Sequence, residues 1–440
     1  MKTPILDFVS AYAGSDTVRA HMPGHKGKGL LGIEHLDITE IKGADDLRSP
    51  EGIILESEGY ATELFGTAHT YYLTEGSTLA IKVMLSLAVG VGGRVLAARN
   101  AHKAFINAAA LLDLSVDWLY SEGEEHLCKC DISADAVRNF LKNAKALPDA
   151  VYITSPDYLG NLLDVKAIAE ACDEFGLPLL VDNAHGAYLG FLDRSIHPIA
   201  LGAAMCADSA HKTLPALTGA AYLHISKKAE QYTSRARSAI SVFASTSPSY
   251  LTLMSLDVCN SYIAGDYRAR LAKCISAIEN IKSMLGERNI SVEQTEPLKL
   301  VLKPAGFGYT TASLAALLRE AKIEPEFVDC DYVVMMLTPS NSEDEIARIF
   351  DFFRDIAALP AILTNEAYTV CSHEQAMSVR AATFAPSECV AVTEAVGRVC
   401  AVPTVSCPPA VPIVVSGEVV TDEDLRIFKR YAIEKIEVVL

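Results

Sequence analysis

The segment Asp208–Thr213 carries the residue types needed for covalent chemistry on a carbonyl group. It reads Asp-Ser-Ala-His-Lys-Thr, which puts Lys212 beside the imidazole of His211 and next to hydroxyl groups. A lysine in a closed, desolvated site loses its proton readily and becomes a nucleophile towards carbonyls. A surface lysine in an ion pair explains this segment alone equally well. Lys212 is therefore a candidate nucleophile that needs support from other segments.

A carboxylate ends a nearly pure apolar stretch earlier in the chain. The stretch is Leu177–Asp182, and Asn183-Ala184-His185-Gly186 follows it. Burying an Asp side chain without a partner is costly, so the Asp182 carboxylate should face a cation or several hydrogen-bond donors. The stretch therefore predicts a buried acceptor for a cationic group.

Two further clusters suit an anion and a flat ring. Gly76-Ser77-Thr78 opens a predicted helix, where hydroxyls and free N–H groups favour a phosphate, although an ordinary helix cap explains it more simply. His102 follows a predicted strand and could stack on a ring, although a lone loop histidine is more often structural. Pyridoxal 5'-phosphate has a phosphate, a flat ring, a basic ring nitrogen for Asp182 and an aldehyde for Lys212. The joint occurrence of these clusters therefore points to that cofactor.

The elements that must position these clusters alternate between β-rich stretches and amphipathic helical patterns. The predicted strands are Thr70–Leu73, Arg94–Ala98, Ala150–Thr154 and Leu177–Asp182, with a further apolar run at Gly202–Ala207. The predicted helices are Ser77–Ala88, Lys103–Leu112 and Val165–Phe175. Continuous apolar strands between helices indicate a parallel sheet covered on both faces. We therefore predict a three-layer α/β/α core with its chemistry at the carboxyl ends of the strands.

The remaining patterns divide the chain into four predicted parts. They are an N-terminal arm (1–65), the cofactor-binding large domain (66–285), a small α+β domain (286–360) and a C-terminal α+β domain (361–440). A helix-rich segment at 250–285 leads out of the core. The small domain has predicted strands at Leu298–Leu302 and Tyr332–Leu337, and helices at Thr311–Ala321 and after Ser342. The last part has predicted helices at Ser387–Glu394 and Asp422–Tyr431 around a Pro-rich turn, Cys407–Pro412.

Composition excludes several classes of protein. Half of the 440 residues are apolar and 21% are charged, which argues against a disordered, collagenous or coiled-coil chain. No stretch approaches the roughly 18 apolar residues of a membrane helix, and the first residues do not resemble a signal peptide. The net charge of −17 repels a nucleic-acid backbone and favours small cationic ligands. We expect neither a nucleic acid nor a membrane as partner.

The cysteines and histidines give no metal-binding pattern. Eleven scattered cysteines indicate a reducing cytoplasm, and Cys128-x-Cys130 lacks the spacing of a zinc ribbon or a thioredoxin motif. His21 and His25 have i, i+4 spacing, but Pro23 and Gly24 break the helix that a zinc site of this type requires. We therefore expect no metal and interpret the cysteines as reduced packing residues.

Longer motifs extend over nearly the whole chain. They are His21-Met-Pro-Gly-His-Lys-Gly27, Asp45-Asp46-Leu47-x-x-Pro50-Glu-Gly52, Arg99-Asn-Ala-His-Lys103, Asp182-x-Ala-His-Gly186, Ser209–Thr218, Ser245–Tyr250, Gly397-Arg398, Pro408-Pro-x-x-Pro412 and Gly417-Glu418. With these motifs the chain resembles the ornithine/lysine/arginine decarboxylases of the aspartate-aminotransferase fold, pyridoxal-phosphate fold type I. It resembles their short form, without an N-terminal receiver-like domain.

The resemblance implies a role for each matching residue. Lys212 would hold the cofactor aldehyde, Asp182 would pair with the ring nitrogen, and His102 would stack on the ring. The phosphate would be surrounded by Ser77, Thr78, Ser209 and His211, with Ala184 and His185 beside the ring. Family members are homodimers with shared active sites, so Thr246 or Ser247 would reach a phosphate in the neighbouring subunit.

The implied reaction removes the α-carboxylate of arginine, lysine or ornithine as carbon dioxide, leaving a di- or polyamine. Lys212 or His211 would protonate the product carbon, and the sequence leaves this choice open. An aminotransferase or another fold-type-I lyase is an alternative, with Arg380 or Arg398 holding the carboxylate. A non-catalytic regulatory relative is another.

Three departures from the family pattern bear on the regulatory alternative. Asn183 replaces a common Glu, Gly219-Ala-Ala221 replaces a segment with Gln and a small polar residue, and Cys407 replaces a usual Tyr. All three could alter substrate contacts while leaving the cofactor chemistry intact.

Overall fold

The computed structural model describes residues 1–122, 126–363, 370, 372–403 and 409–440, so the predictions for Cys407 and Pro408 lie outside the described residues. The chain forms two compact units. The first comprises Met1–Val91, Phe140–Ile153 and Val165–Arg268, and the second comprises Gly92–Asn139, Thr154–Asp164 and Ala269–Leu440. The four-part division drawn from the sequence stays a prediction.

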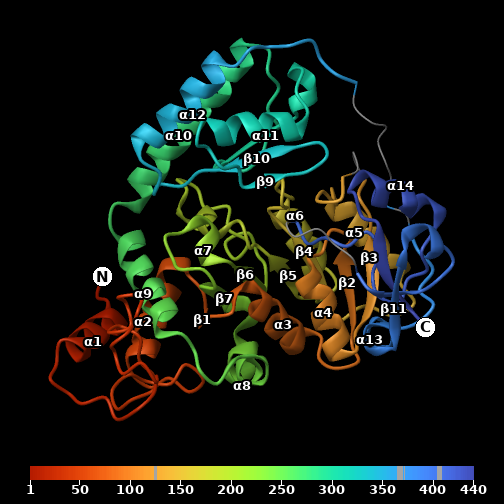
Figure 1. Ribbon diagram of the computed structural model, residues 1–440. Coiled ribbons are helices and arrows are strands. Elements are labelled where there is room, and N and C mark those ends of the chain that lie inside the picture. Colours follow the sequence, from red (N-terminus) through yellow and green to blue (C-terminus); the bar gives the residue numbers. More distant parts are fainter. Residues whose placement is uncertain (123–125, 364–369, 371, 404–408) are drawn as a thin grey trace. The chain divides into compact units, whose positions relative to one another are not determined.

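The largest sheet has seven strands (Figure 1). In spatial order they are β1 (His69–Leu73), β7 (Ala221–Ile225), β6 (Met205–Asp208), β5 (Leu179–Asp182), β4 (Ala150–Thr154), β2 (Arg94–Ala98) and β3 (Ser115–Leu119). Every residue of β5, β6 and β7 is buried, which requires cover on both faces and agrees with the predicted layered α/β core.

The direction of β7 differs from the all-parallel sheet that the sequence predicts. β5 and β6 are parallel, as are β2 and β3, but β7 is antiparallel to both β1 and β6. A parallel return after β6 would need a full crossover helix, usually a dozen or more residues with their connections. The chain between β6 and β7 contains only the four-residue helix α7 (Ala210–Thr213) and a loop, so it turns back antiparallel. The sheet is therefore mixed.

Helices of the first unit pack around its strands. α3 (Gly76–Ala88) contacts β1, β5, β6 and β7, and its apolar side includes Leu79, Val83 and Leu87. α2 (Ile53–Phe65) and α9 (Tyr250–Ala264) contact β1 and each other, and α1 (Pro4–Ala13) packs on both. Further helices are α6 (Val165–Asp173), which contacts β5, and α8 (Thr233–Phe243), which contacts α3.

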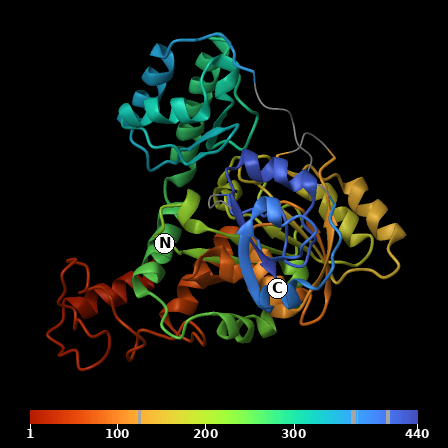
Figure 2. The ribbon, with the colours of Figure 1, turned by 45° about the vertical axis from the view of Figure 1, so that its right-hand side comes forward.

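The second unit contains two small antiparallel sheets (Figure 2). One has the order β8 (Lys299–Leu302), β10 (Val333–Met336), β9 (Phe327–Val328), and the other β11 (Ser387–Ala391), β13 (Lys435–Val439), β12 (Cys400–Val402). Its helices include α4 (Lys103–Leu112), α11 (Thr311–Glu320), α12 (Glu343–Asp355), α13 (Val379–Phe384) and α14 (Asp422–Arg430). α5 (Ala134–Asn143) and α10 (Tyr267–Glu287) each run from one unit into the other.

Most predicted elements are present within a few residues of their predicted bounds. Arg94–Ala98, Lys103–Leu112 and Ala150–Thr154 coincide with β2, α4 and β4, and α12 begins at a capping box formed by Ser342 and Glu345. The helix predicted at Ser387–Glu394 is wrong. Ser387–Ala391 instead forms β11, which pairs along its whole length with β13, and a short 3-10 turn follows it. Strand pairing outweighs the weak helical preference of this segment.

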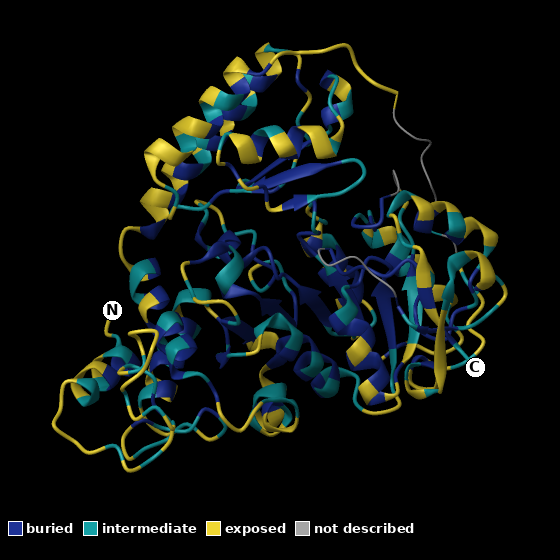
Figure 3. Cartoon of the chain, viewed as in Figure 1, coloured by how far each residue is buried: buried dark blue, intermediate teal, exposed yellow. Residues whose placement is uncertain are grey.

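Figure 3 shows buried residues concentrated in the strands, with exposed residues on the outer sides of the helices. Over the described parts of the chain, no helix combines the length and the apolar composition needed to cross a membrane.

Candidate active site

Three strands of the first unit end at one edge of the sheet. Because β7 is antiparallel to both β1 and β6, β1 and β6 run in the same direction, and β5 is parallel to β6. Asp182 and Asp208 are the last residues of β5 and β6. Lys212 follows on α7, and Ser77 lies at the start of α3 just after β1. The sheet direction therefore brings the predicted lysine, carboxylate and hydroxyl clusters to a common edge.

The start of α3 offers donors for an anion. The hydroxyl of Ser209 donates to the Ser77 hydroxyl across 2.9 Å, which joins two clusters that are distant in the sequence. Glu75 precedes the helix and makes no side-chain cap hydrogen bond. Ser77 and Thr78 are only partly buried. Hydroxyls beside an uncapped helix N-terminus suit a phosphate.

Two glycines shape this turn. Gly76 has a φ of +70°, and its N–H donates to the Gly219 carbonyl across 2.8 Å. Gly219 has a φ of +91°, and a Cβ there would lie 2.8 Å from the Thr74 carbonyl oxygen. Only glycine meets both requirements without strain. The departure at Gly219 therefore has a backbone role.

Lys212 contacts an imidazole. Its Nζ lies 3.0 Å from Nε2 of His185, a residue that is 4% exposed. His211, the preceding residue, donates from Nδ1 to the Ala220 carbonyl across 2.9 Å, and burial lowers the pKa of its imidazole. The amine of Lys212 therefore lies beside the imidazole of His185, on a partly buried residue at the start of the chain segment that follows β6.

Asp182 is a buried carboxylate with few donors. It is 3% exposed, and it accepts hydrogen bonds from the Tyr152 hydroxyl and from the Ala184 N–H, each across 3.2 Å. Burial raises the pKa of Asp182, while the charge of Lys212 acts in the opposite direction. A cation against this carboxylate would favour its ionised form. Sequence reasoning missed Tyr152, because the first four residues of β4 are all buried and give no alternation that would single it out.

A second buried carboxylate, that of Asp208 at the end of β6, has several hydrogen-bond partners. Asp208 accepts from Asn183 Nδ2 at Oδ1 across 2.8 Å, and from Nε2 of His197 and His224 at Oδ2 across 2.9 and 3.1 Å. The other ring nitrogen of His224 lies 2.9 Å from the hydroxyl of Thr70. Burial acts to raise the pKa of Asp208, but the two imidazoles outweigh it and hold this pKa below its usual range. The sequence analysis named Asp208 but did not predict this network.

The other predicted site residues have different surroundings. His102 belongs to the second unit, where its Nδ1 accepts from the Ala104 N–H and caps α4, so its ring-stacking role stays a prediction. Thr246 and Ser247 are exposed, and the N–H of Ser245 donates to Glu75 Oε1 across 3.0 Å. The segment 245–247 thus lies beside the residue that precedes α3.

Two arginines considered for an aminotransferase have structural contacts within the second unit. Arg380 donates to the carbonyls of Ala110 and Leu111 across 3.1 and 3.0 Å. Arg398 pairs with Glu388 across 2.7 Å and donates to the Val439 carbonyl. Both side chains thus make structural contacts, and nothing in these contacts supports the transaminase alternative.

Motif residues of the second unit also have a structural role. Arg99 pairs with Glu418 across 3.2 Å and donates to the carbonyls of Pro412 and Ile413. The side chains of Arg99 and Glu418 are 4% and 1% exposed. This pair joins three of the motifs that the sequence analysis found far apart in the chain.

Comparison with known proteins agrees with this architecture. Residues 3–304 match the family described as Orn/Lys/Arg decarboxylase, major domain, and residues 361–434 match its C-terminal domain. An arginine decarboxylase of Halalkalibacterium halodurans is 30% identical, over 96% of this chain and 92% of its own length. An arginine decarboxylase of Bacillus subtilis is 29% identical, over 97% of this chain and 93% of its own length.

Solved structures show the same fold. The lysine decarboxylase LdcF of Francisella novicida superposes with a TM-score of 0.81 at 16% identity, covering 100% of this chain and 81% of that one. The constitutive lysine decarboxylase of Escherichia coli gives 0.79 at 17% identity, covering 100% of this chain and 82% of that one. At such identities the likeness shows the fold alone, which is that of pyridoxal-phosphate fold type I.

Proposed function

The chain belongs to the Orn/Lys/Arg decarboxylase family, and from this premise we propose that it is a pyridoxal-phosphate-dependent decarboxylase of a basic amino acid. The observation that carries the proposal is the common sheet edge at which Lys212, Asp182 and the Ser77–Ser209 pair occur. No single cluster requires this cofactor, but together they match its aldehyde, its ring nitrogen and its phosphate.

The residues present fit the cofactor. The hydroxyls of Ser77 and Ser209 and the uncapped start of α3 suit its phosphate, with Thr78 and His211 as further predicted contacts. Asp182 is a buried carboxylate with a raised pKa, and a protonated ring nitrogen would favour its charge. When bound, the cofactor supplies a conjugated electron sink for the electrons of the broken bond.

This chain's residues orient the reactants. Lys212 would hold the cofactor through its aldehyde, and the Asp182 carboxylate would favour a protonated ring nitrogen. The family motifs predict Ala184, His185 and His102 as further contacts of the ring. Tyr152 stabilises the ionised form of Asp182 through its hydroxyl. These roles follow from the family motifs and are supported by the contacts of Lys212 and Asp182.

The contacts favour Lys212 over His211 as the proton donor to the product carbon. His211 uses its Nδ1–H for the Ala220 carbonyl, and its lowered pKa leaves the ring neutral near pH 7. A neutral ring has no second proton to give. The Lys212 amine has protons to give when it is not bonded to the cofactor, and it lies beside His185.

Arginine is the first substrate to test. The relatives that match nearly the whole chain include proteins named arginine decarboxylase, whereas matches named lysine or ornithine decarboxylase cover 56–61% of this chain. The net charge of −17 favours a cationic substrate by long-range attraction. The product would be a di- or polyamine.

Two measurements test the proposed function. Borohydride reduction and peptide mapping should find the cofactor on Lys212, and an adduct on Lys103 or no adduct would contradict the assignment. Incubation with arginine, lysine and ornithine, followed by mass spectrometry, should show one amine formed together with carbon dioxide. A yellow protein that releases no carbon dioxide from any of them would instead favour a regulatory relative or a transaminase.

We also propose a cytoplasmic homodimer with shared active sites. The resemblance of Ser245–Tyr250 to a segment that crosses the subunit boundary in relatives supports the dimer. The cysteines in the described part of the chain are all free thiols, which agrees with a reducing compartment. Sedimentation analysis should show a dimer, and a stable, fully active monomer would refute it.

A further inference from the structure

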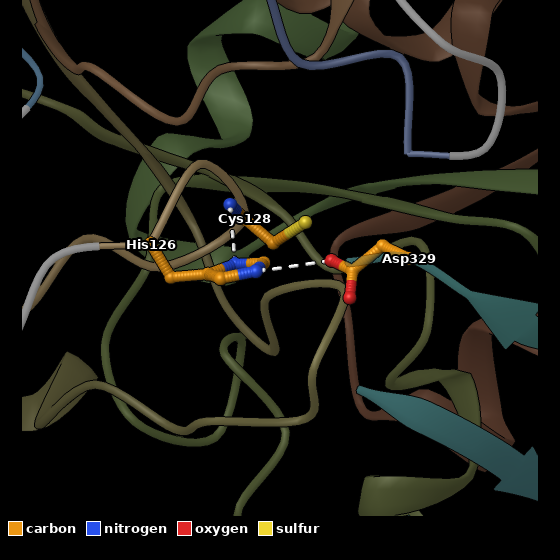
Figure 4. Close-up of side chains that lie close together, drawn as sticks. All are labelled: His126, Cys128 and Asp329. Carbon is orange, nitrogen blue, oxygen red and sulfur yellow. Dashed lines mark hydrogen bonds and ion pairs between the residues drawn. The ribbon is translucent and has the colours of Figure 1, made fainter. Parts of the chain in front are cut away.

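The second unit contains a buried cluster of metal-binding residue types that the proposed reaction does not use. His126, Cys128 and Asp329 each place one ligand atom within 4.8 Å of the others. His126 is 5% exposed, Cys128 is 1% exposed, and the side chain of Asp329 is 4% exposed. Figure 4 shows the imidazole, the thiol and the carboxylate turned toward one another.

Asp329 presents one oxygen to this cluster. Its Oδ1 accepts from the N–H groups of Asp331 and Tyr332 across 2.8 and 2.7 Å, which fixes the orientation of the carboxylate. Its Oδ2 then lies 3.0 Å from His126 Nε2, in a contact that lacks hydrogen-bond geometry, and has no hydrogen-bond partner in the described structure. A buried carboxylate oxygen that makes no hydrogen bond and lies beside an imidazole nitrogen is a candidate ligand atom for a cation.

A tight turn holds the other two side chains together. The Lys129 N–H donates to the His126 carbonyl across 2.8 Å, and the Cys128 N–H donates to His126 Nδ1 across 3.2 Å. The imidazole packs edge-on against Tyr332, with ring centroids 5.0 Å apart. The turn therefore keeps the imidazole and the thiol close together, and the Tyr431 hydroxyl lies 3.3 Å from His126 Nε2.

We propose that His126, Cys128 and Asp329 form a zinc-binding site. Thiolate, imidazole and carboxylate are the ligands that zinc takes, and two ligand atoms on a tetrahedral zinc lie about 3.5 Å apart. The observed spacing needs only small side-chain rotations to reach this value. Asp331 Oδ2 lies 3.8 Å from His126 Nε2, but the Asp331 carboxylate already pairs with Arg430 and accepts from the Cys330 thiol.

The sequence analysis expected no metal because Cys128-x-Cys130 lacks a zinc-site spacing. The structure explains the difference, since the third ligand comes from the turn between β9 and β10. Zinc bound in this place would fasten that turn to the 126–128 loop within the second unit. It is therefore a structural site, separate from the decarboxylation chemistry.

Zinc binding changes the protonation of two of the ligands, Cys128 and His126. Zinc displaces the thiol proton of Cys128, which is released to solvent. The ring proton of His126 lies on Nε2 while Nδ1 accepts from the Cys128 amide, so ligation through Nε2 requires this proton to move to Nδ1. The long 3.2 Å contact between Nδ1 and the Cys128 amide then opens by a small rotation of the ring.

The test is a titration of the metal-stripped full-length protein with Zn²⁺ against a chromophoric chelator, and with Co²⁺ in a difference spectrum. We expect one equivalent of Zn²⁺ per chain and a thiolate-to-cobalt charge-transfer band. Cys128→Ala should abolish the band. Asp329→Asn should weaken Zn²⁺ binding by more than about 100-fold, beyond the roughly 10–100-fold that loss of a second-shell partner costs.

The choice of variants separates the loss of a zinc ligand from a general disturbance of the fold. Asn at 329 can still accept the Asp331 and Tyr332 amides through Oδ1, so this variant preserves the turn while removing the charge. Cys130→Ala is the matched control, because Cys130 is also buried but its thiol donates to the Leu119 carbonyl. The proposal is overturned if the native protein binds no stoichiometric Zn²⁺, if bound Co²⁺ shows no thiolate band, or if Cys130→Ala removes that band.

Discussion

Asn183 donates from Nδ2 to Oδ1 of Asp208 across 2.8 Å, in a place where neither side chain reaches water. Asn183 directly follows Asp182, and Asp208 ends the neighbouring strand β6. An Asn side chain suits this position because its amide group donates a hydrogen bond, and the partner, the Asp208 carboxylate, accepts one. A Glu, which is common here in the family, would set a second carboxylate against Asp208. The departure at Asn183 is therefore matched to Asp208.

This relationship predicts the effect of exchanging the two side chains. Asn183→Asp should lower the free energy of unfolding by about 1–3 kcal/mol or more, because it replaces a buried donor with a second acceptor. The double variant Asn183→Asp with Asp208→Asn should recover much of that loss. Asn at 208 can accept from His197 and His224 through its oxygen, while its amide donates to the carboxylate introduced at position 183.

Urea denaturation of the native protein, both single variants and the double variant gives a complete double-mutant cycle. We expect a favourable coupling of about 0.5–3 kcal/mol between the two positions. Additive effects of the two substitutions would show that the 2.8 Å contact contributes nothing specific.

A second prediction concerns Asp182 and its partner Tyr152. Asp182→Asn keeps the shape of the side chain but removes the charge that we propose keeps the ring nitrogen protonated. We expect turnover to fall by about two orders of magnitude or more, equivalent to ~3 kcal/mol. Tyr152→Phe removes one donor to the same carboxylate and should cost about tenfold in turnover.

Steady-state kinetics at saturating cofactor checks both values. Cofactor affinity should fall less than turnover, since the phosphate contacts and Lys212 remain. Near-normal turnover of Asp182→Asn would mean that Asp182 is only a strand-end residue and that the proposed ring position is wrong.

A third prediction concerns pH and the buried carboxylate of Asp257. It accepts from the N–H groups of Ile5 and Leu6 across 2.9 and 3.0 Å, and burial raises its pKa to about 6. A raised folded-state pKa means that its contribution to stability is complete below about pH 4 and is lost as the pH rises through 6. A shift of this size corresponds to up to about 3 kcal/mol.

Asp257→Asn should remove this part of the pH dependence. The Asn oxygen can accept the two backbone amides, and its amide can donate to Ser57, whose hydroxyl already contacts Tyr72. Urea unfolding of the cofactor-free protein between pH 4 and 8 should give a flatter curve for the variant. Parallel curves for the two proteins would show that Asp257 does not titrate in this range.

A fourth prediction isolates the close approach at Gly219. Gly219→Ala combines a positive φ with a Cβ 2.8 Å from the Thr74 oxygen, whereas Gly176→Ala has a φ of +69° and no atom within 4 Å of the added Cβ. Both variants should lose about 1 kcal/mol from backbone strain, and Gly219→Ala should lose about 1–3 kcal/mol more from the clash. Thermal unfolding compares them, and equal losses would mean that the turn relaxes freely.

The order of elements in the core and the polar clusters at strand ends could be predicted from the sequence. Strand and helix patterns are local, so β2, α4 and β4 have their predicted bounds. Residues that follow a strand in a layered α/β fold must lie at its carboxyl edge, which placed Asp182 at the end of β5 and Lys212 after β6. The family motifs added roles to these residues, and those roles remain predictions.

Contacts between distant segments were decided only by the tertiary structure. The pairing of β7 with β1, the strand at Ser387–Ala391, the Tyr152–Asp182 hydrogen bond and the His126–Asp329 pair all depend on partners in other parts of the chain. The local sequence indicates which secondary structure a residue prefers. These features depend instead on which distant segment packs against that residue in the folded chain. A weak local preference yields to strand pairing, and a buried polar group takes whatever partner the fold places within hydrogen-bond distance.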